Sequence, residues 1–308
     1  MTAPAPRPRA GRRRRAPWLV TALVLALLPV SSAAADSDRR QVAVQLKAIH
    51  RRAATHAQRL NAVSALFVGR PFAASPLGEG PAGRVDADPI ARFDRFDCVT
   101  YVEQVMALSW HESLDVAIAE LQRVRYTDGT IRYGARKHIM MAQWIPENVA
   151  AGFVRDITAA VAGPSASVAE LTLDHGAFVA AAGQALRLAR ADRPLGVHRL
   201  PILPVAALSS RIEQVPHGTI ITSIRAARPG VPYRASHVGL VIVDPDGKRV
   251  VRHAHRRRGR VIEQPLQAFA QAARRGRRWP IVGFHLLAIA ERPPAPVLKP
   301  TDERSAGP

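Results

Sequence analysis

Residues 236–248 read SHVGLVIVDPDGK, a β-branched apolar run that ends in a turn sequence. Residues 236–243 suit a strand, because Val and Ile pack well on a pleated surface and successive side chains face opposite sides. Residues 245–247 suit a three-residue hairpin loop, since Pro favours the start of a type I turn and Gly favours the left-handed position that closes it. The stretch therefore predicts a β-hairpin within an antiparallel sheet.

Histidines are predicted to gather at one end of this hairpin. With a three-residue loop, Asp244 pairs with Lys248, and counting outward brings His237 opposite His255. His253 lies two residues away on the same face. Cross-strand neighbours and their diagonals lie within about 5 to 8 Å, so either His253 or His255 is close enough to orient the His237 ring.

The rest of the chain predicts helices first and strands later. Helical spacing of apolar residues occupies residues 36–66, 98–108, 114–124, 142–150 and 178–190. Strand patterns occupy residues 218–224, 249–253 and 281–289. Between the first two helices, the Pro- and Gly-rich residues 69–94 predict an ordered surface loop. This order predicts an α+β fold with a helical N-terminal half and a C-terminal antiparallel β-sheet.

Composition excludes several classes of protein. The 308 residues include 44 Lys and Arg against 24 Asp and Glu, a formal net charge of +20, and a single cysteine. One cysteine excludes a disulfide framework within the chain and a Cys-rich metal site. With 47% hydrophobic residues, the chain is globular. The charge alone is weak evidence for nucleic-acid binding, and no nucleic-acid motif accompanies it, so we expect no nucleic-acid partner.

The N-terminus has the pattern of a secretory signal peptide. Residues 12–15 are four arginines, residues 18–30 are an apolar run, and Ala33 and Ala35 supply the small residues of a cleavage site. Thirteen residues are too few to span a membrane, which needs roughly 20, although an uncleaved anchor is the alternative. We expect cleavage near Ala35, export to the periplasm, cell envelope or medium, and only transient membrane contact.

The predicted mature chain is one domain with a tail. Removing residues 1–35 takes away six arginines and lowers the formal net charge to +14. Residues 36–290 are predicted to form the single domain, and the Pro-rich residues 291–308 a disordered tail. We expect a monomer.

Cys98 has two interpretations. A single cysteine is commonly a small buried hydrophobe. Asp97, however, is a good N-cap, so Cys98 would occupy the first turn of a helix, where the macrodipole lowers thiol pKa values. A free thiol in an exported protein is a liability unless it is used or buried. The context favours a nucleophile, for which His237 is the candidate base.

The histidines also allow other interpretations. Arg256, Arg257 and Arg258 follow His255 directly, so that end of the strand suits a solvated basic edge. A metal site built from the three histidines is conceivable, but no metal-binding spacing supports it. No G-x-S-x-G motif is present, and Ser236 is better interpreted as a neighbour of the base than as a nucleophile. We expect no metal and no cofactor.

Two motifs together resemble a known family. FDCVTYVE at residues 96–103 and SHVG at residues 236–239 resemble the N-acetylmuramoyl-L-alanine amidase-like cysteine hydrolases, relatives of NlpC-type cell-wall peptidases with a papain-like fold. The resemblance extends over about residues 45–290. It includes residues 76–80, 126–148 and 156–158.

The resemblance implies a site and a fold. It implies a papain-like domain in which Cys98 is the nucleophile, His237 the general base and acid, and His253 the residue that orients it. It also implies substrate-facing side chains, namely Arg136, His138, Trp144 and Asn148. Ile139 departs from the family, in which we expect an aromatic residue at that position. For Trp144 the alternative to substrate binding is a structural role in the core.

The expected function is hydrolysis of peptidoglycan. By the resemblance, the chain cleaves an amide through a thioester, as an N-acetylmuramoyl-L-alanine amidase acting on peptidoglycan or muropeptides. Clustered arginines suit this carboxylate-rich substrate. A γ-D-glutamyl-diamino-acid endopeptidase and a catalytically inactive wall-binding module are the alternatives.

Overall fold

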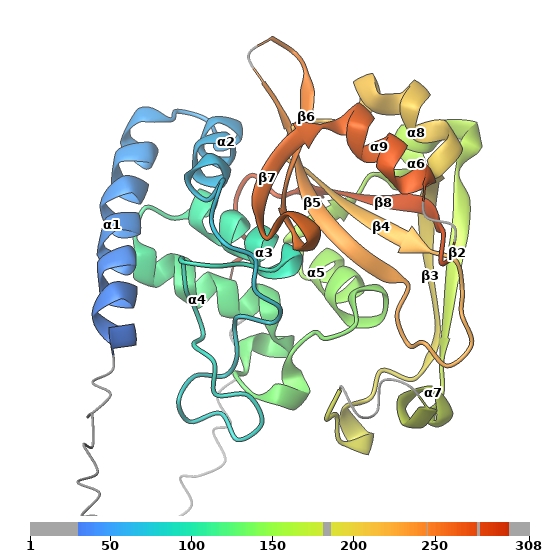
Figure 1. The fold of residues 1–308 in the computed structure, drawn as a ribbon, viewed down its shortest axis with the longest axis horizontal. Helices are drawn as coiled ribbons and strands as arrows, with labels where there is room; N and C mark the ends of the chain where they lie inside the picture. The colour runs from blue at the N-terminus through green and yellow to red at the C-terminus, as the bar shows by residue number, and fades with distance from the viewer. Residues whose placement is uncertain (1–29, 181–185, 245, 276–277, 296–308) are drawn as a thin grey trace, which may run out of the picture.

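An antiparallel sheet is the centre of the protein (Figure 1). The computed structural model describes residues 30–180, 186–244, 246–275 and 278–295. Within them the sheet has eight strands. They are β1 (Val154–Asp156), β2 (Ser167–Leu173), β3 (Gly196–Pro204), β4 (Thr219–Arg225), β5 (Ala235–Val243), β6 (Arg249–His255), β7 (Arg260–Pro265) and β8 (Ile281–Ile289).

The strands follow the order β2-β3-β8-β4-β5-β6-β7, and β1 also pairs with β8. Every pair is antiparallel. The hairpin of β5 and β6 has the predicted register, with Val243 opposite Arg249 and Leu240 opposite Arg252. The N–H of Asp244 donates to the carbonyl of Lys248 at 2.9 Å, as the three-residue loop requires.

Helices cover both faces of the sheet. They are α1 (Val30–Arg52), α2 (His56–Leu66), α3 (Cys98–Trp110), α4 (Leu114–Arg125), α5 (Ile145–Ala150), α6 (Thr158–Ala162), α7 (His175–Ala180), α8 (Val205–Arg211) and α9 (Leu266–Arg274). Figure 1 shows α1 to α5 beside one face, with α6, α8 and α9 gathered against the other. None of the described helices is long and apolar enough to cross a membrane.

Alternating side chains of the central strands build two cores. Ile220 and Leu240 pack toward the N-terminal helices, whereas Ile221 and Val241 pack toward α6, α8 and α9. All four side chains are fully buried. A strand alternates its faces every residue, so a sheet covered on both sides needs apolar residues at consecutive positions, as these strands have.

The predicted α+β character is confirmed, with three corrections to its elements. The helix predicted over residues 36–66 is two helices, because Thr55 caps α2 and forms a capping box with Gln58. Strands β1, β2, β3 and β7 were not predicted. Of the helix predicted over 178–190, the part up to Ala180 is helical, residues 186–189 are not, and residues 181–185 lie outside the described residues.

The predicted ends of the chain are largely outside the described residues. Residues 1–29 and 296–308 belong to this part. Helix α1 begins at Val30, so cleavage near Ala35 would fall inside it. Among the described residues of the predicted tail, the carbonyls of Pro294 and Ala295 accept hydrogen bonds from the Arg123 side chain, at 3.0 and 3.2 Å.

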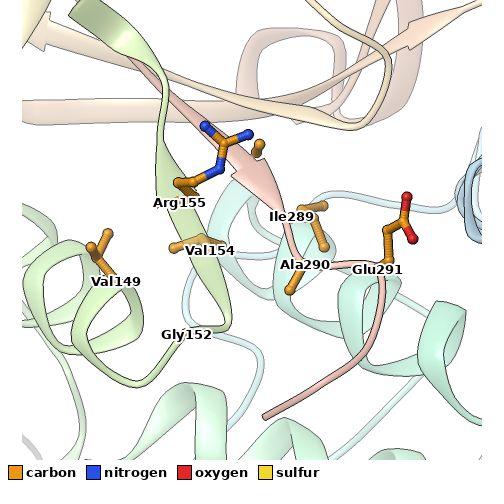
Figure 2. Close-up of a pocket in the computed structure, with 8 residues that line it drawn as sticks. Val149, Gly152, Val154, Arg155, Ile289, Ala290 and Glu291 are labelled. Atoms are coloured by element: carbon orange, nitrogen blue, oxygen red, sulfur yellow. The ribbon is translucent and has the colours of Figure 1, made fainter.

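A cavity of about 510 Å³ lies where β1 pairs with β8 (Figure 2). Val149, Val154 and Ile289 give it apolar walls, and Arg155 and Glu291 are its charged residues. None of the predicted site residues lines it.

Candidate active site

Cys98 is the first residue of α3, as predicted. Its N-cap Asp97 accepts the Thr100 N–H at 2.8 Å, and the Thr100 hydroxyl accepts the Asp97 N–H at 3.0 Å. The second carboxylate oxygen of Asp97 accepts the Ser75 N–H at 3.1 Å. These bonds satisfy N–H groups that a helix start leaves open, and they fix the place at which the thiol enters the helix.

The thiol lies at a gap between β5 and β6, which we call the seam. In the described residues the two strands pair only as far as Leu240 and Arg252, while β6 continues to pair with β7 as far as His255. N–H groups of even-numbered β5 residues point toward β6, as that of Asp244 does. The N–H of Val238 acts there to lower the pKa of the Cys98 thiol.

Three backbone N–H groups act to lower the pKa of the Cys98 thiol. Those of Cys98 and Val99 come from the helix start, and that of Val238 comes from β5. Each favours negative charge on the sulfur, because a hydrogen bond to the charged form of a group lowers its pKa. These donors would therefore stabilise negative charge that forms on the sulfur.

His237 adjoins this seam and is hydrogen-bonded to His253. Its Nε2 lies 2.6 Å from Nδ1 of His253, which is 1% exposed. Only Nδ1 of His237 is then left for a reacting thiol. A base that accepts a proton at Nδ1 must carry its own proton on Nε2, so His253 would accept that N–H and keep the ring in the required tautomer.

His255 lies opposite His237 in the predicted register, but the hydrogen bond goes to the diagonal neighbour. The His255 ring centroid is 6.4 Å from that of His237, and its Nδ1 accepts the Arg258 N–H at 3.4 Å. The three rings do not form a metal site: no group of three or more His, Cys, Asp or Glu residues in the described part of the chain is placed to hold a metal ion.

Gly239 makes room for His253. A Cβ at this glycine would lie 3.2 Å from the Cβ of His253 and 2.6 Å from the Val251 side chain. Phe269 closes the same face, 5.6 Å from the His253 ring and 6.1 Å from the His237 ring. A glycine inside a strand commonly marks such a close approach, so Gly239 carries a sequence signal for this contact.

Burial sets the resting protonation of Cys98 and His237. It raises the pKa of the Cys98 thiol to about 12, with the Asp97 charge adding to the effect and the three N–H groups opposing it. It lowers the pKa of His237 to about 4, helped by His255 and Arg225. The lowered thiol pKa predicted from the helix start was wrong, because desolvation of the thiolate outweighs the helix terminus. At pH 7 the resting pair is a thiol and a neutral imidazole.

Alkylation tests this resting state. At pH 7 we expect iodoacetamide to modify Cys98 at least about tenfold more slowly than the same cysteine in urea, where its pKa is near 8.5. The native rate should rise about tenfold per pH unit up to pH 9, because the thiolate fraction does. Intact-mass spectrometry reads the reaction directly, since the chain has one cysteine. Fast modification at pH 6 would instead show a resting thiolate.

Two of the predicted substrate-facing residues are corrected. Trp144 is 1% exposed, and its Nε1 donates to Glu103 at 2.8 Å inside the core. Asn148 is 0% exposed and joins Lys137, at 2.9 Å, to the Val124 carbonyl, at 3.2 Å. Neither side chain faces a substrate in this structure.

The side chains of the other two predicted residues form hydrogen bonds within the protein. Arg136 donates to Glu79 and Asp86, at 2.8 Å in each case, and thereby holds the loop that follows Ser75. His138 donates from Nε2 to the Tyr133 carbonyl at 2.8 Å, and burial lowers its pKa to about 4. Arg136 therefore anchors this loop, and the carboxylates of Glu79 and Asp86 balance its charge.

Comparisons with known proteins agree with this architecture. The model of the AmiA-like family, described as N-acetylmuramoyl-L-alanine amidase-like, matches residues 62–276. The Legionella pneumophila protein LPG0564, of the DUF1460 family, is 24% identical with a TM-score of 0.74, over 86% of this chain and 100% of its own. An N-acetylmuramoyl-L-alanine amidase from Bacteroides uniformis is 22% identical with a TM-score of 0.61, over 76% of this chain and 98% of its own.

These two structures share the fold. No curated protein matches the sequence. The family model covers more than two thirds of the chain, including the helix that begins at Cys98 and the strand that carries His237. The chain therefore belongs to the N-acetylmuramoyl-L-alanine amidase-like family of hydrolases.

Proposed function

We propose that the protein is an exported peptidoglycan hydrolase that cleaves an amide bond with Cys98, His237 and His253. The observation that carries the proposal is the seam, where the N–H of Val238 acts on the Cys98 thiol and the preceding residue of β5, His237, is hydrogen-bonded to His253. A nucleophile at a helix start, a base on the adjoining strand and a third polar residue on the next strand are also the arrangement that the resemblance to NlpC-type, papain-like hydrolases implies.

The first half of the reaction forms a thioester. His237 Nδ1 takes the thiol proton as the sulfur attacks the amide carbonyl carbon. The Nε2–H of the resulting His237 imidazolium donates to Nδ1 of His253. Negative charge passes from sulfur to the carbonyl oxygen, and the Cys98 N–H at the helix start is placed to follow it. His237 then returns the proton to the leaving amine.

The second half releases the acid. His237 takes a proton from water, the hydroxide adds to the thioester carbonyl, and the thiolate leaves and regains its proton. Because the resting thiol and imidazole are both neutral, the ion pair exists only during the reaction. Chain residues supply every proton transfer, and the proposed enzyme acts as a monomer without a cofactor.

Charge supports a cell-wall substrate. The predicted mature chain carries +14, and exposed arginines 256–258 lie directly after His255. A positive surface beside a site raises the encounter rate with a polyanion. Carboxylates of the stem peptides give peptidoglycan the matching charge, and export brings the enzyme to it.

The bond cleaved is proposed to be the lactyl amide to L-Ala. Residues 36–308 should be incubated with purified sacculi, and the soluble fragments analysed by mass spectrometry. A free lactyl group with a free L-Ala N-terminus supports the amidase, whereas a free diamino-acid N-terminus identifies the endopeptidase. If no fragment leaves sacculi of any stem-peptide type, the protein is a binding module and the proposal fails.

A further inference from the structure

Four arginines surround the connection between β6 and β7. Residues 256–258 form one 3-10 turn, Gly259 follows in the left-handed region with φ of 67°, and β7 begins at Arg260. All four arginine side chains are exposed, and the first of them directly follows His255, the last residue of β6. We call these residues the arginine turn, namely Arg256, Arg257, Arg258 and Arg260.

The arginine turn lacks a counter-ion. Within the described residues no ion pair or side-chain hydrogen bond occupies its four guanidinium groups. Acidic residues on neighbouring elements are already paired with other arginines: Asp38 with Arg70 at 3.2 Å, Asp94 with Arg92 and Arg95 at 2.7 Å each, and Glu263 with Arg252 at 2.7 Å. Four positive charges within five residues repel one another, so a polyanion that binds there is stabilised.

Backbone hydrogen bonds hold the arginine turn against the loop that begins at residue 69. The N–H of Gly69 donates to the Val261 carbonyl at 2.9 Å, and the Val261 N–H donates to the Arg70 carbonyl at 2.8 Å. The N–H of Phe72 donates to the Gly259 carbonyl at 2.8 Å. The arginines therefore project from a fixed backbone, and only their side chains lose freedom when an anion binds.

The same loop connects the arginine turn to the start of α3. The N–H of Ala73 donates to the Phe96 carbonyl at 3.0 Å, and Asp97, the N-cap of α3, follows Phe96. The backbone at Gly259 is therefore two hydrogen-bonded neighbours away from the backbone that leads into Cys98. Segments paired in this way lie about 4.8 Å apart, so the arginine turn and the candidate active site occupy adjoining parts of the molecule.

The arginine turn also adjoins the histidines. The N–H of Arg258 donates to Nδ1 of His255 at 3.4 Å, and the His255 ring lies 6.4 Å from that of His237. Burial lowers the pKa of His255, and the charges of Arg258 and Arg257 add to this effect. His255 thus stays neutral between the cations of the turn and the histidine pair, and the positive charge remains at the surface.

We propose that the arginine turn is a docking surface for carboxylates of a peptidoglycan strand, which it holds beside the candidate active site. This inference rests on the proposed function, because it names the surface through which that enzyme engages its polymeric substrate. Guanidinium groups pair with carboxylates through two parallel donors. A strand carries one stem peptide after another, so several arginines are occupied at once, which a short fragment does not achieve.

Binding of an inactive enzyme to sacculi tests the docking surface without turnover. The full chain with Cys98→Ala should be sedimented with sacculi freed of phosphate polymers. Adding Arg256→Gln, Arg257→Gln and Arg258→Gln should weaken binding about tenfold, because three exposed ion pairs, each worth about a factor of two, are lost. Amidation of the sacculus carboxylates should give a similar loss. So should raising NaCl from about 0.15 to 1 M, which shortens the Debye length from about 8 to 3 Å.

A matched variant separates the docking surface from net charge. Arg51→Gln, Arg52→Gln and Arg155→Gln remove the same charge from exposed positions on α1 and β1, and in the described residues these arginines have no ion pair. This variant should bind sacculi within about twofold of its parent, and thermal unfolding shows that each variant is folded. An equal loss in both triple variants, no loss in the first, or undiminished binding to amidated sacculi would overturn the inference. Binding to phosphatidylglycerol vesicles but not to sacculi would overturn it as well.

Kinetics distinguish this inference from the proposed function. In the active enzyme, the arginine-turn variant should slow cleavage of sacculi at least about fivefold more than cleavage of a soluble disaccharide-tripeptide, because only the polymer spans both surfaces. Equal losses on the two substrates would place the effect in the active site and refute the docking surface. Sacculus binding that depends on the arginine turn, in a wild type that cleaves neither substrate, would retain the docking surface and refute the proposed function.

Discussion

Replacing Cys98 with Ala is expected to reduce peptidoglycan solubilisation to the uncatalysed background, a loss of at least about a thousandfold. No other cysteine exists in the chain to substitute for it. The measurement is the release of soluble fragments from dye-labelled sacculi by residues 36–308. Cys98→Ser is the matched variant, since its hydroxyl keeps an acceptor for the Val238 N–H but is a far weaker nucleophile at neutral pH.

The fold should survive both changes. Cys98→Ala leaves the Val238 N–H without its acceptor, which costs on the order of 1 to 3 kcal/mol, whereas Cys98→Ser should cost less. Thermal unfolding followed by circular dichroism separates lost chemistry from lost structure. Undiminished release by a folded Cys98→Ala protein would show that the sulfur is not the nucleophile.

Substitution of the three histidines by Ala should lower kcat/KM to different extents. His237→Ala removes the base and should lower kcat/KM about a thousandfold or more. His253→Ala leaves the base without its orienting partner and should cost about tenfold to a hundredfold, whereas His255→Ala should stay within about threefold because its nitrogen contacts Arg258. A larger loss in His255→Ala than in His253→Ala would reverse these two roles.

The pH dependence of kcat/KM distinguishes an effect of His253 on the His237 ring from a general loss of protein stability. Burial holds the pKa of His237 near 4, so the base remains neutral, and the enzyme active, down to about pH 5. His253→Ala admits water to the ring and should move that pKa up toward 6.5, which shifts the acid limb of kcat/KM to higher pH. His253→Asn keeps a hydrogen-bond acceptor and should recover part of the loss. An acid limb that does not move in His253→Ala would contradict the proposed contact.

Local signals predicted the parts of the site that depend on local structure. Asp97 caps α3 because a carboxylate satisfies an open N–H, which is readable from a few residues. The hairpin register followed from its loop and brought His237 and His253 within reach. The split between α1 and α2 was not predicted, although Thr55 and Gln58 carry its local signal.

Burial and partner choice depend on the whole fold. Trp144 could be assigned to the core only when α3 placed Glu103 against its indole. The thiol pKa likewise follows from packing against the seam, which outweighs the helix terminus named by the sequence. The short outer strands, such as β7, carry too few alternating apolar residues to be predicted alone.

The seam has a consequence for how activity appears during folding. Cys98 and His237 are separated by about 140 residues, and contacts of such long sequence separation form slowly because closing the loop is entropically costly. The sulfur takes the place of a strand partner, so it reaches its donors only after β5 and β6 have paired and α3 has docked against them. A partly folded chain therefore holds Cys98 and His237 apart, and the proposed active site exists only in the finished structure.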